Sequence, residues 1–106
     1  MEFESIYAAI NKAVERKAYY WKEHIIQRMT TRKISVAEIL EILSNYEIIE
    51  EYRYDRPFPS YLLVGFSGGR PVHLVIGVNI EDKEIHLITV YIPDDSIWED
   101  NYRRRK

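Results

Sequence analysis

The chain has 106 residues, enough for one compact domain with its own core but little room for a second. Apolar residues make up 46% of it, which excludes a disordered chain, and the lack of cysteine excludes a disulfide scaffold and any thiolate metal site. The net charge of −2 argues against nucleic-acid binding, yet basic residues gather in segments 22–33 and 103–106 while acidic residues gather in segment 38–51. With no apolar run long enough to cross a bilayer and no secretory signal at the start, we expect a cytoplasmic protein without a membrane partner.

Helices are expected over about residues 2–45. Segment 2–17 has apolar residues at helical spacing, and the aromatic segment 18–21 is either a link or a continuation into one long helix ending at Arg32. Segment 22–34 predicts a second helix. Ser35, followed three residues later by Glu38, has the form of a capping box and predicts a third helix that ends near Asn45.

Strands are expected over about residues 46–92. Four apolar runs, at 46–54, 61–66, 72–78 and 85–92, are separated by short turns, which favours an antiparallel meander. We therefore predict an α+β single domain over residues 1–106, with N-terminal helices packed on one face of a four-stranded antiparallel sheet. Trp98 and Tyr102 are expected to dock back on the domain and to leave residues 103–106 as a loose basic tail.

The second predicted helix carries a row of residues suited to phosphate chemistry. His24, Arg28 and Arg32 recur every four residues and share one face of this helix. An imidazole offers a proton carrier near neutral pH, and a guanidinium offers a rigid fork of donors. A solvated helix edge is the alternative interpretation of the same spacing.

The late strands offer polar partners for this row. On the third strand His73 faces away from Val72 and Leu74. On the fourth strand Thr89 and Tyr91 share a face. Its opposite face is expected to be a core face and comprises His86, Ile88, Val90 and Ile92. In a meander His73 would lie beside Thr89 and Tyr91, with Arg70 at the same end of the sheet.

Each of these residues also has a structural interpretation. Taken alone, His73 is more often a partly buried, hydrogen-bonded histidine than a catalytic one, Thr89 is a good strand former, and Tyr91 is one of nine tyrosines. The three histidines lie far apart in the chain without a ligand spacing, so we expect no metal and no cofactor.

Four motifs in order resemble one known protein family. They are His24-x3-Arg28-Met29-x2-Arg32, the acidic segment 47–51 leading to Pro59-Ser60, Arg70-Pro71-x-His73, and Ile88-Thr89-x-Tyr91-x-Pro93-Asp94 before Trp98 and an arginine-rich end. The motifs cover most of the chain after Tyr20. They resemble a family of small bacterial and archaeal proteins often encoded beside a YgiT-type (MqsA-like) zinc-finger antitoxin and grouped with the RelE, barnase and colicin type of ribonuclease fold. Lys33 and Tyr46 stand where glycine is common in that family, which concerns turns rather than chemistry.

The resemblance implies the toxin of a type II toxin–antitoxin system, an endoribonuclease that cuts RNA without a metal. Its partners would be RNA, including mRNA at the ribosome, and a cognate zinc-finger antitoxin. The catalytic roles we assign are proton transfer to His24 and His73, phosphate binding to Arg28, and orientation of the phosphate or a base to Thr89 and Tyr91. The residues assigned to RNA binding are Arg32, Arg70, Arg103 and Arg104.

Two other hypotheses remain open at this point. One is a non-catalytic module that binds RNA or ribosomes, for which the charges of Arg28 and Arg32 would matter more than the histidines. The other is a protein-interaction domain that uses its acidic strand as the main surface and is bound by an antitoxin.

Overall fold

The computed structural model describes residues 3–106, so the expected helix start at Glu2 lies outside the described residues. Three helices occupy the first half of the chain, as predicted. They are α1 (Glu4–Glu15), α2 (Glu23–Arg32) and α3 (Val36–Ser44). A short strand, β1 (Tyr19–Trp21), separates α1 from α2, so the aromatic segment is neither a helix nor a simple link.

The sheet has five strands in the order β1-β5-β4-β3-β2. The predicted antiparallel meander is confirmed for β2 (Tyr46–Tyr52), β3 (Ser60–Ser67), β4 (Arg70–Asn79) and β5 (Glu84–Tyr91). The prediction of a four-stranded, wholly antiparallel sheet is wrong, because β1 adds to β5 in parallel. Aromatic residues suit a strand, and Ala18 and Lys22 extend the pairing by main-chain hydrogen bonds to Ile85 and Leu87.

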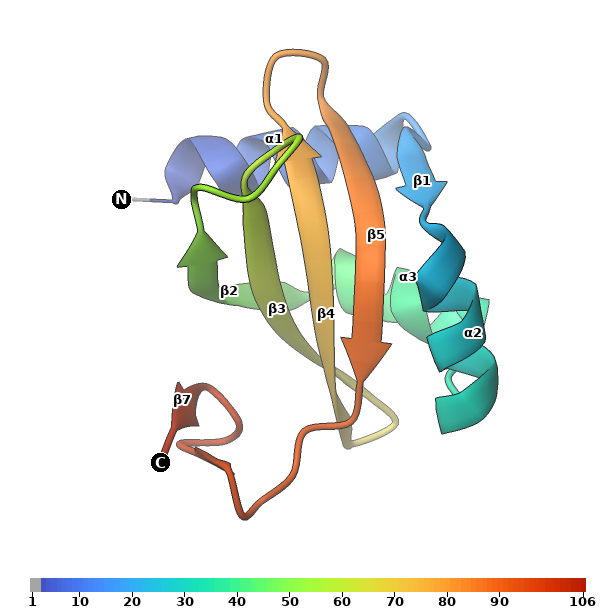
Figure 1. Cartoon of the computed structure of the whole chain (residues 1–106), viewed down its shortest axis with the longest axis vertical. Helices are drawn as coiled ribbons and strands as arrows, with labels where there is room; N and C mark the ends of the chain where they lie inside the picture. The colour runs from blue at the N-terminus through green and yellow to red at the C-terminus, as the bar shows by residue number, and fades with distance from the viewer. Residues whose placement is uncertain (1–2) are drawn as a thin grey trace.

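The helices cover one face of this sheet. Figure 1 shows α1 and α3 crossing behind the strands, with α2 to the right of β5, below β1. Apolar side chains from α1, α2 and α3 pack there against alternate residues of the strands, and Ile10, Ile25, Ile39, Leu74 and Leu87 are among the fully buried ones. The predicted α+β class and the helices on one face are therefore confirmed.

A β-bulge at Ile88 changes the faces of β5. Pairing moves from Thr89 opposite Val75 to Leu87 opposite Ile76, so Ile88 has no partner in the ladder. The core side chains of β5 are consequently Ile85, Leu87 and Val90. The predicted core face of His86, Ile88, Val90 and Ile92 is wrong except for Val90.

The C-terminal segment, residues 93–106, folds back on the other face of the sheet. It contains a two-stranded hairpin of β6 (Trp98–Glu99) and β7 (Arg104–Arg105), seen at the lower left of Figure 1. Trp98 is only 4% exposed, which confirms the predicted docking. The expected loose tail is wrong, because Arg103 pairs with Glu47 at 2.6 Å and Arg105 pairs with Glu50 at 2.8 Å.

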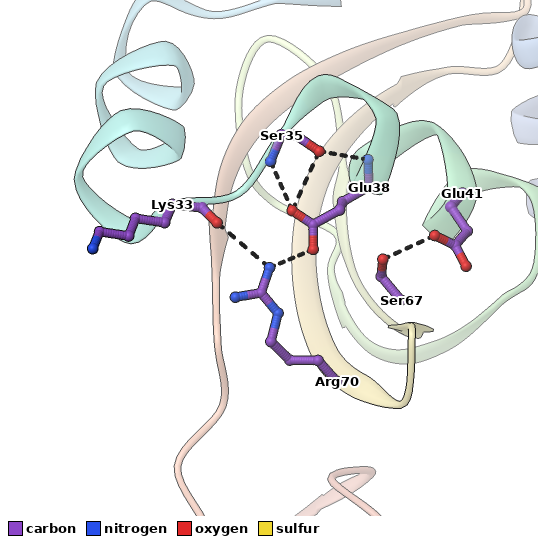
Figure 2. A network of polar contacts seen from close by, with 6 residues as sticks. All are labelled: Lys33, Ser35, Glu38, Glu41, Ser67 and Arg70. Atoms are coloured by element: carbon purple, nitrogen blue, oxygen red, sulfur yellow. Dashed lines mark hydrogen bonds and ion pairs between the residues drawn. The ribbon is translucent and has the colours of Figure 1, made fainter.

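The start of α3 is fixed by the predicted capping box. The main-chain N–H of Glu38 donates to the Ser35 hydroxyl at 3.1 Å, and the main-chain N–H of Ser35 donates to the Glu38 carboxylate at 2.9 Å (Figure 2). Lys33, just before it, has a left-handed φ of 56° and ends α2. Glycine would adopt that backbone conformation most easily, so the lysine here departs from the family motif at a turn.

Replacing Ser35 with alanine is expected to lower the free energy of unfolding by about 1 kcal/mol, because a helix N–H loses its acceptor. Urea denaturation followed by circular dichroism measures this change. Ser44→Ala is the matched control, since the Ser44 hydroxyl bonds only to the Glu41 carbonyl at the far end of α3. Equal losses in the two variants would contradict a capping role.

Candidate active site on the open sheet face

His73 lies at the centre of a polar cluster on the sheet face that the helices leave free. Its side chain is 0% exposed, and its Cα pairs with that of Tyr91 on the neighbouring strand. The imidazole contacts the Tyr91 ring at a centroid distance of 5.2 Å and the Trp98 ring at 4.5 Å, both edge-to-face. The C-terminal segment therefore forms a lid over this histidine.

Both ring nitrogens of His73 have partners. Nε2 lies 2.8 Å from the main-chain carbonyl oxygen of Tyr102, and Nδ1 lies 3.1 Å from the Tyr91 hydroxyl. A carbonyl only accepts, so Nε2 carries the proton and Nδ1 accepts the hydrogen bond that Tyr91 donates. His73 is thus a neutral imidazole, and the lone pair of its Nδ1 atom accepts the hydrogen bond from the Tyr91 hydroxyl.

Burial sets the protonation of this cluster. It lowers the pKa of His73 below its ordinary value, although the Tyr102 carbonyl and the Glu50 charge act in the opposite direction. Burial also raises the pKa of Tyr91; the guanidiniums of Arg105 and Arg32 oppose that rise, and the Glu50 charge adds to it. Two cations and one carboxylate therefore act on the Tyr91 hydroxyl, and Arg105 is itself paired with that carboxylate.

The free energy of unfolding is expected to fall as the pH is lowered below about 6.5. The unfolded imidazole of His73 takes up a proton near that pH, whereas the folded one has a lowered pKa and stays neutral. The unfolded state then binds more protons, so acid favours it. Urea denaturation at about pH 7.5 and about pH 5.5 measures the difference.

The matched comparison for this pH effect is His73→Gln beside His86→Gln. The pKa of His86 is also lowered, chiefly by burial, so each variant should remove a separate part of the slope. Carboxylates with a lowered pKa, such as Glu50, act at lower pH, near and below their ordinary value of 4.5. An unchanged slope in His73→Gln would contradict the neutral, buried imidazole.

Glu50 and Arg105 belong to this site although the sequence did not point to them. The Arg105 guanidinium donates to both Glu50 carboxylate oxygens, at 2.8 and 3.1 Å, and stacks over Trp98 at 4.6 Å. The Tyr52 hydroxyl donates to Glu50 at 2.5 Å. Burial would raise the pKa of Glu50, but the hydrogen bonds from Arg105 and Tyr52 hold it below its ordinary value.

The row of His24, Arg28 and Arg32 lies on α2 and is called the α2 row below. The Arg32 guanidinium donates to the main-chain carbonyl of Val90 at 2.7 Å, between Thr89 and Tyr91 on β5. The side chains of His24 and Arg28 are exposed and make no hydrogen bond or ion pair with residues 3–106. Two helical turns separate His24 from Arg32, about 12 Å along the axis.

The remaining predicted residues are placed as follows. Thr89 shares the open face with His73 and Tyr91 and is half-buried. Arg70 forms an ion pair with Glu38 and reaches the Lys33 carbonyl at 3.5 Å, which joins β4 to the start of α3 (Figure 2). In the C-terminal segment Arg103 pairs with Glu47, and Arg104 pairs with Glu99 and Asp100. Arg70, Arg103 and Arg104 thus have acidic partners and lack the free guanidiniums expected of an RNA-binding row.

The described residues hold neither a metal-binding cluster nor a membrane-spanning helix. Within residues 3–106, no three histidine, aspartate or glutamate side chains gather where they could hold a metal ion. In the same range no helix is both long and apolar enough to span a membrane.

These features define a small α+β protein with a buried imidazole–tyrosine pair on the sheet face opposite its helices. The profile of one family, described as a domain of unknown function (DUF4258), matches residues 21–92. The chain belongs to this family. No curated protein and no solved structure matches this chain significantly. The matched range runs from β1 to the end of β5, so it contains the α2 row, His73 and Tyr91.

Proposed function

We propose that this protein is the toxin of a type II toxin–antitoxin system, an endoribonuclease that cleaves RNA without a metal. The proposal rests on the groups that surround the Tyr91 hydroxyl. This hydroxyl donates to the neutral Nδ1 of His73 and lies near the guanidiniums of Arg32 and Arg105. A phosphodiester bound there would meet two cations and a proton relay, which are the groups that cleavage by the ribose hydroxyl requires.

The reaction proposed is attack of the ribose 2′-hydroxyl on the adjacent phosphorus. The O2′–P bond forms and the P–O5′ bond breaks, leaving a cyclic phosphate and a free 5′-hydroxyl. The 2′ proton passes through Tyr91 to Nδ1 of His73, and a proton must return to the leaving O5′ oxygen. Glu50 and the Tyr102 carbonyl both favour the imidazolium that forms at His73.

The second proton has two candidate donors. One is the imidazolium of His73 itself, acting back through Tyr91, and the other is His24 on the α2 row. The separation of His24 from Arg32 favours His24 and Arg28 as contacts to a neighbouring nucleotide. Full cleavage by His24→Ala would assign both transfers to the Tyr91–His73 pair.

RNA binding in this proposal falls to the cations of α2 and of the C-terminal segment. Arg32 and Arg28 lie on α2, and Arg104 on β7 is exposed and paired with Glu99 and Asp100. The partners proposed are mRNA, at the ribosome or free, and a zinc-finger antitoxin of the YgiT/MqsA type. Phosphate contacts would make the affinity fall as salt rises.

The direct test is incubation of purified protein with a defined RNA in the presence of a chelator. Cyclic phosphate ends should appear, and their yield should be unaffected by the chelator. Induced expression should also arrest growth and degrade cellular RNA. Intact RNA at all protein concentrations, with or without ribosomes, would refute the nuclease.

A second candidate function is a non-catalytic module that acts by binding. An open apolar groove of about 550 Å³ lies between α2 and α3. Its walls include Ile26 and Val36, which are 57% and 48% exposed. An antitoxin segment seated in this groove, with growth arrest retained in His73→Gln and Tyr91→Phe, would favour binding over cleavage.

A further inference from the structure

A cavity lies on the same open sheet face, toward the start of β5. It has a volume of about 210 Å³ and centres on His86, whose Cα pairs with that of Gly77. We call it the His86 cavity. Its lining residues are Lys22, Asp55, Arg56, Pro57, Phe58, Gly77, His86 and Ile88. The predicted core role of His86 is thus replaced by a place in the wall of a cavity.

Aromatic rings flank His86. The Phe58 ring stacks on the imidazole at a centroid distance of 5.1 Å with an interplanar angle of 25°. The Tyr20 ring lies at 5.4 Å and 31° from the same imidazole and is partly exposed. Flat, partly open ring surfaces of this kind favour contact with another planar group.

The His86 ring has an unmet hydrogen-bonding group. Its Nε2 atom is shielded from solvent and has no hydrogen-bond partner among residues 3–106. Buried polar atoms without partners are few in native proteins, because leaving one unpaired is costly. A ligand with a polar edge would supply the missing partner.

Positive charge stands at the mouth of the cavity. Burial and the Lys22 ammonium both lower the pKa of His86, while the Glu84 carboxylate opposes them. Arg56 lines the same cavity, is exposed, and makes no ion pair within residues 3–106. Asp55, the acidic residue of the lining, accepts a hydrogen bond from the Ser60 hydroxyl.

We propose that the His86 cavity binds one base of single-stranded RNA, with Lys22 and Arg56 contacting the adjoining phosphates. A protein binds a nucleotide through a stacking surface, a hydrogen-bonding group and nearby cations. The cavity offers all three. This inference rests on the proposed function. His86 is five residues from Tyr91 on β5, at most about 16 Å, so the bound base lies beyond the cleaved linkage.

The test measures affinity separately from cleavage. A fluorescent 2′-O-methyl oligoribonucleotide lacks the attacking hydroxyl, so its anisotropy reports binding alone. Phe58→Leu should weaken binding about 5- to 150-fold, the range expected for loss of one stacked base. Tyr54→Leu is the control, because Tyr54 belongs to the same loop but is 81% exposed and lines no part of the cavity.

Gly77→Ala provides a second variant that keeps every ring and charge. The added Cβ would have its nearest neighbours at 3.7 to 4.0 Å, so the fold accommodates it, and the methyl group would occupy the floor of the cavity. We expect at least a fivefold loss of affinity with an unchanged or higher melting temperature, since a strand favours alanine over glycine.

The outcomes separate this inference from the proposed function. If Phe58→Leu and Gly77→Ala both keep the wild-type affinity and cleave RNA at the wild-type rate, the His86 cavity does not bind a base. The proposed nuclease activity would be unaffected by that result. Loss of affinity in both variants, in a protein that cleaves no RNA, would support the cavity and refute the nuclease. Ribonucleoside monophosphates binding as tightly as the oligonucleotide would overturn recognition of an RNA strand in favour of a free nucleotide.

Discussion

Replacing Trp98 with alanine should lower the free energy of unfolding by about 3–5 kcal/mol, the largest loss of stability expected in the C-terminal segment. The side chain is 4% exposed and packs edge-on against His73, with the Arg105 guanidinium on its face. Its removal would leave a cavity over the buried imidazole and would remove the ring on which the Arg105 guanidinium stacks. Urea denaturation measures the change.

The control is the neighbouring residue Ile97, which is 49% exposed. Ile97→Ala should change the free energy of unfolding by no more than about 0.5 kcal/mol. A small effect of Trp98→Ala, similar to that of Ile97→Ala, would mean that the C-terminal segment contributes little to the stability of the domain.

Replacing Tyr91 with phenylalanine should lower the rate of RNA cleavage about 10²- to 10⁴-fold, the contribution of one positioned acid–base group. The variant keeps the ring but removes the hydroxyl that donates to Nδ1 of His73. His73→Ala is expected to lose at least about 10²-fold for the same reason. Single-turnover cleavage with enzyme in excess measures the chemical step.

A tyrosine outside the site provides the matched control. The Tyr7 hydroxyl accepts a hydrogen bond from the main-chain N–H of Ile48 at 2.8 Å, on the helix side of the sheet. Tyr7→Phe and Tyr91→Phe each remove one hydrogen bond, so both should lower the free energy of unfolding. Only Tyr7→Phe should keep the full cleavage rate. Retained cleavage in both His24→Ala and His73→Ala would refute the site itself.

The sequence predicted the helices and the meander because those elements carry regular patterns. Apolar residues recur at helical spacing in α1 and α3, and Ser35 with Glu38 marks a helix start. Strand β1 was missed because its three residues are too few to show a period, and its partner β5 lies more than sixty positions later. Such a pairing depends on tertiary packing that a local pattern does not record.

Only the part of the site that lies on regular strands was predicted. Alternation on regular strands placed His73 beside Tyr91, as the register shows. Glu50 was missed because β2 has a bulge between Ile48 and Glu50, which turns Glu50 to the open face in place of Ile49. Arg105 was overlooked because four basic residues in a row are usually solvated, and its partner Glu50 lies 55 positions earlier in the chain.

The parallel pairing of β1 with β5 has a consequence for how the chain is made. The first strand of the sheet gains its partner only after residues 84–91 are synthesised, and His73 is covered only by residues that come later still. Distant pairings of this kind form late, because closing the intervening chain costs entropy before any contact is gained. A polypeptide whose residues 84–106 are still inside the ribosome would therefore lack the finished sheet face.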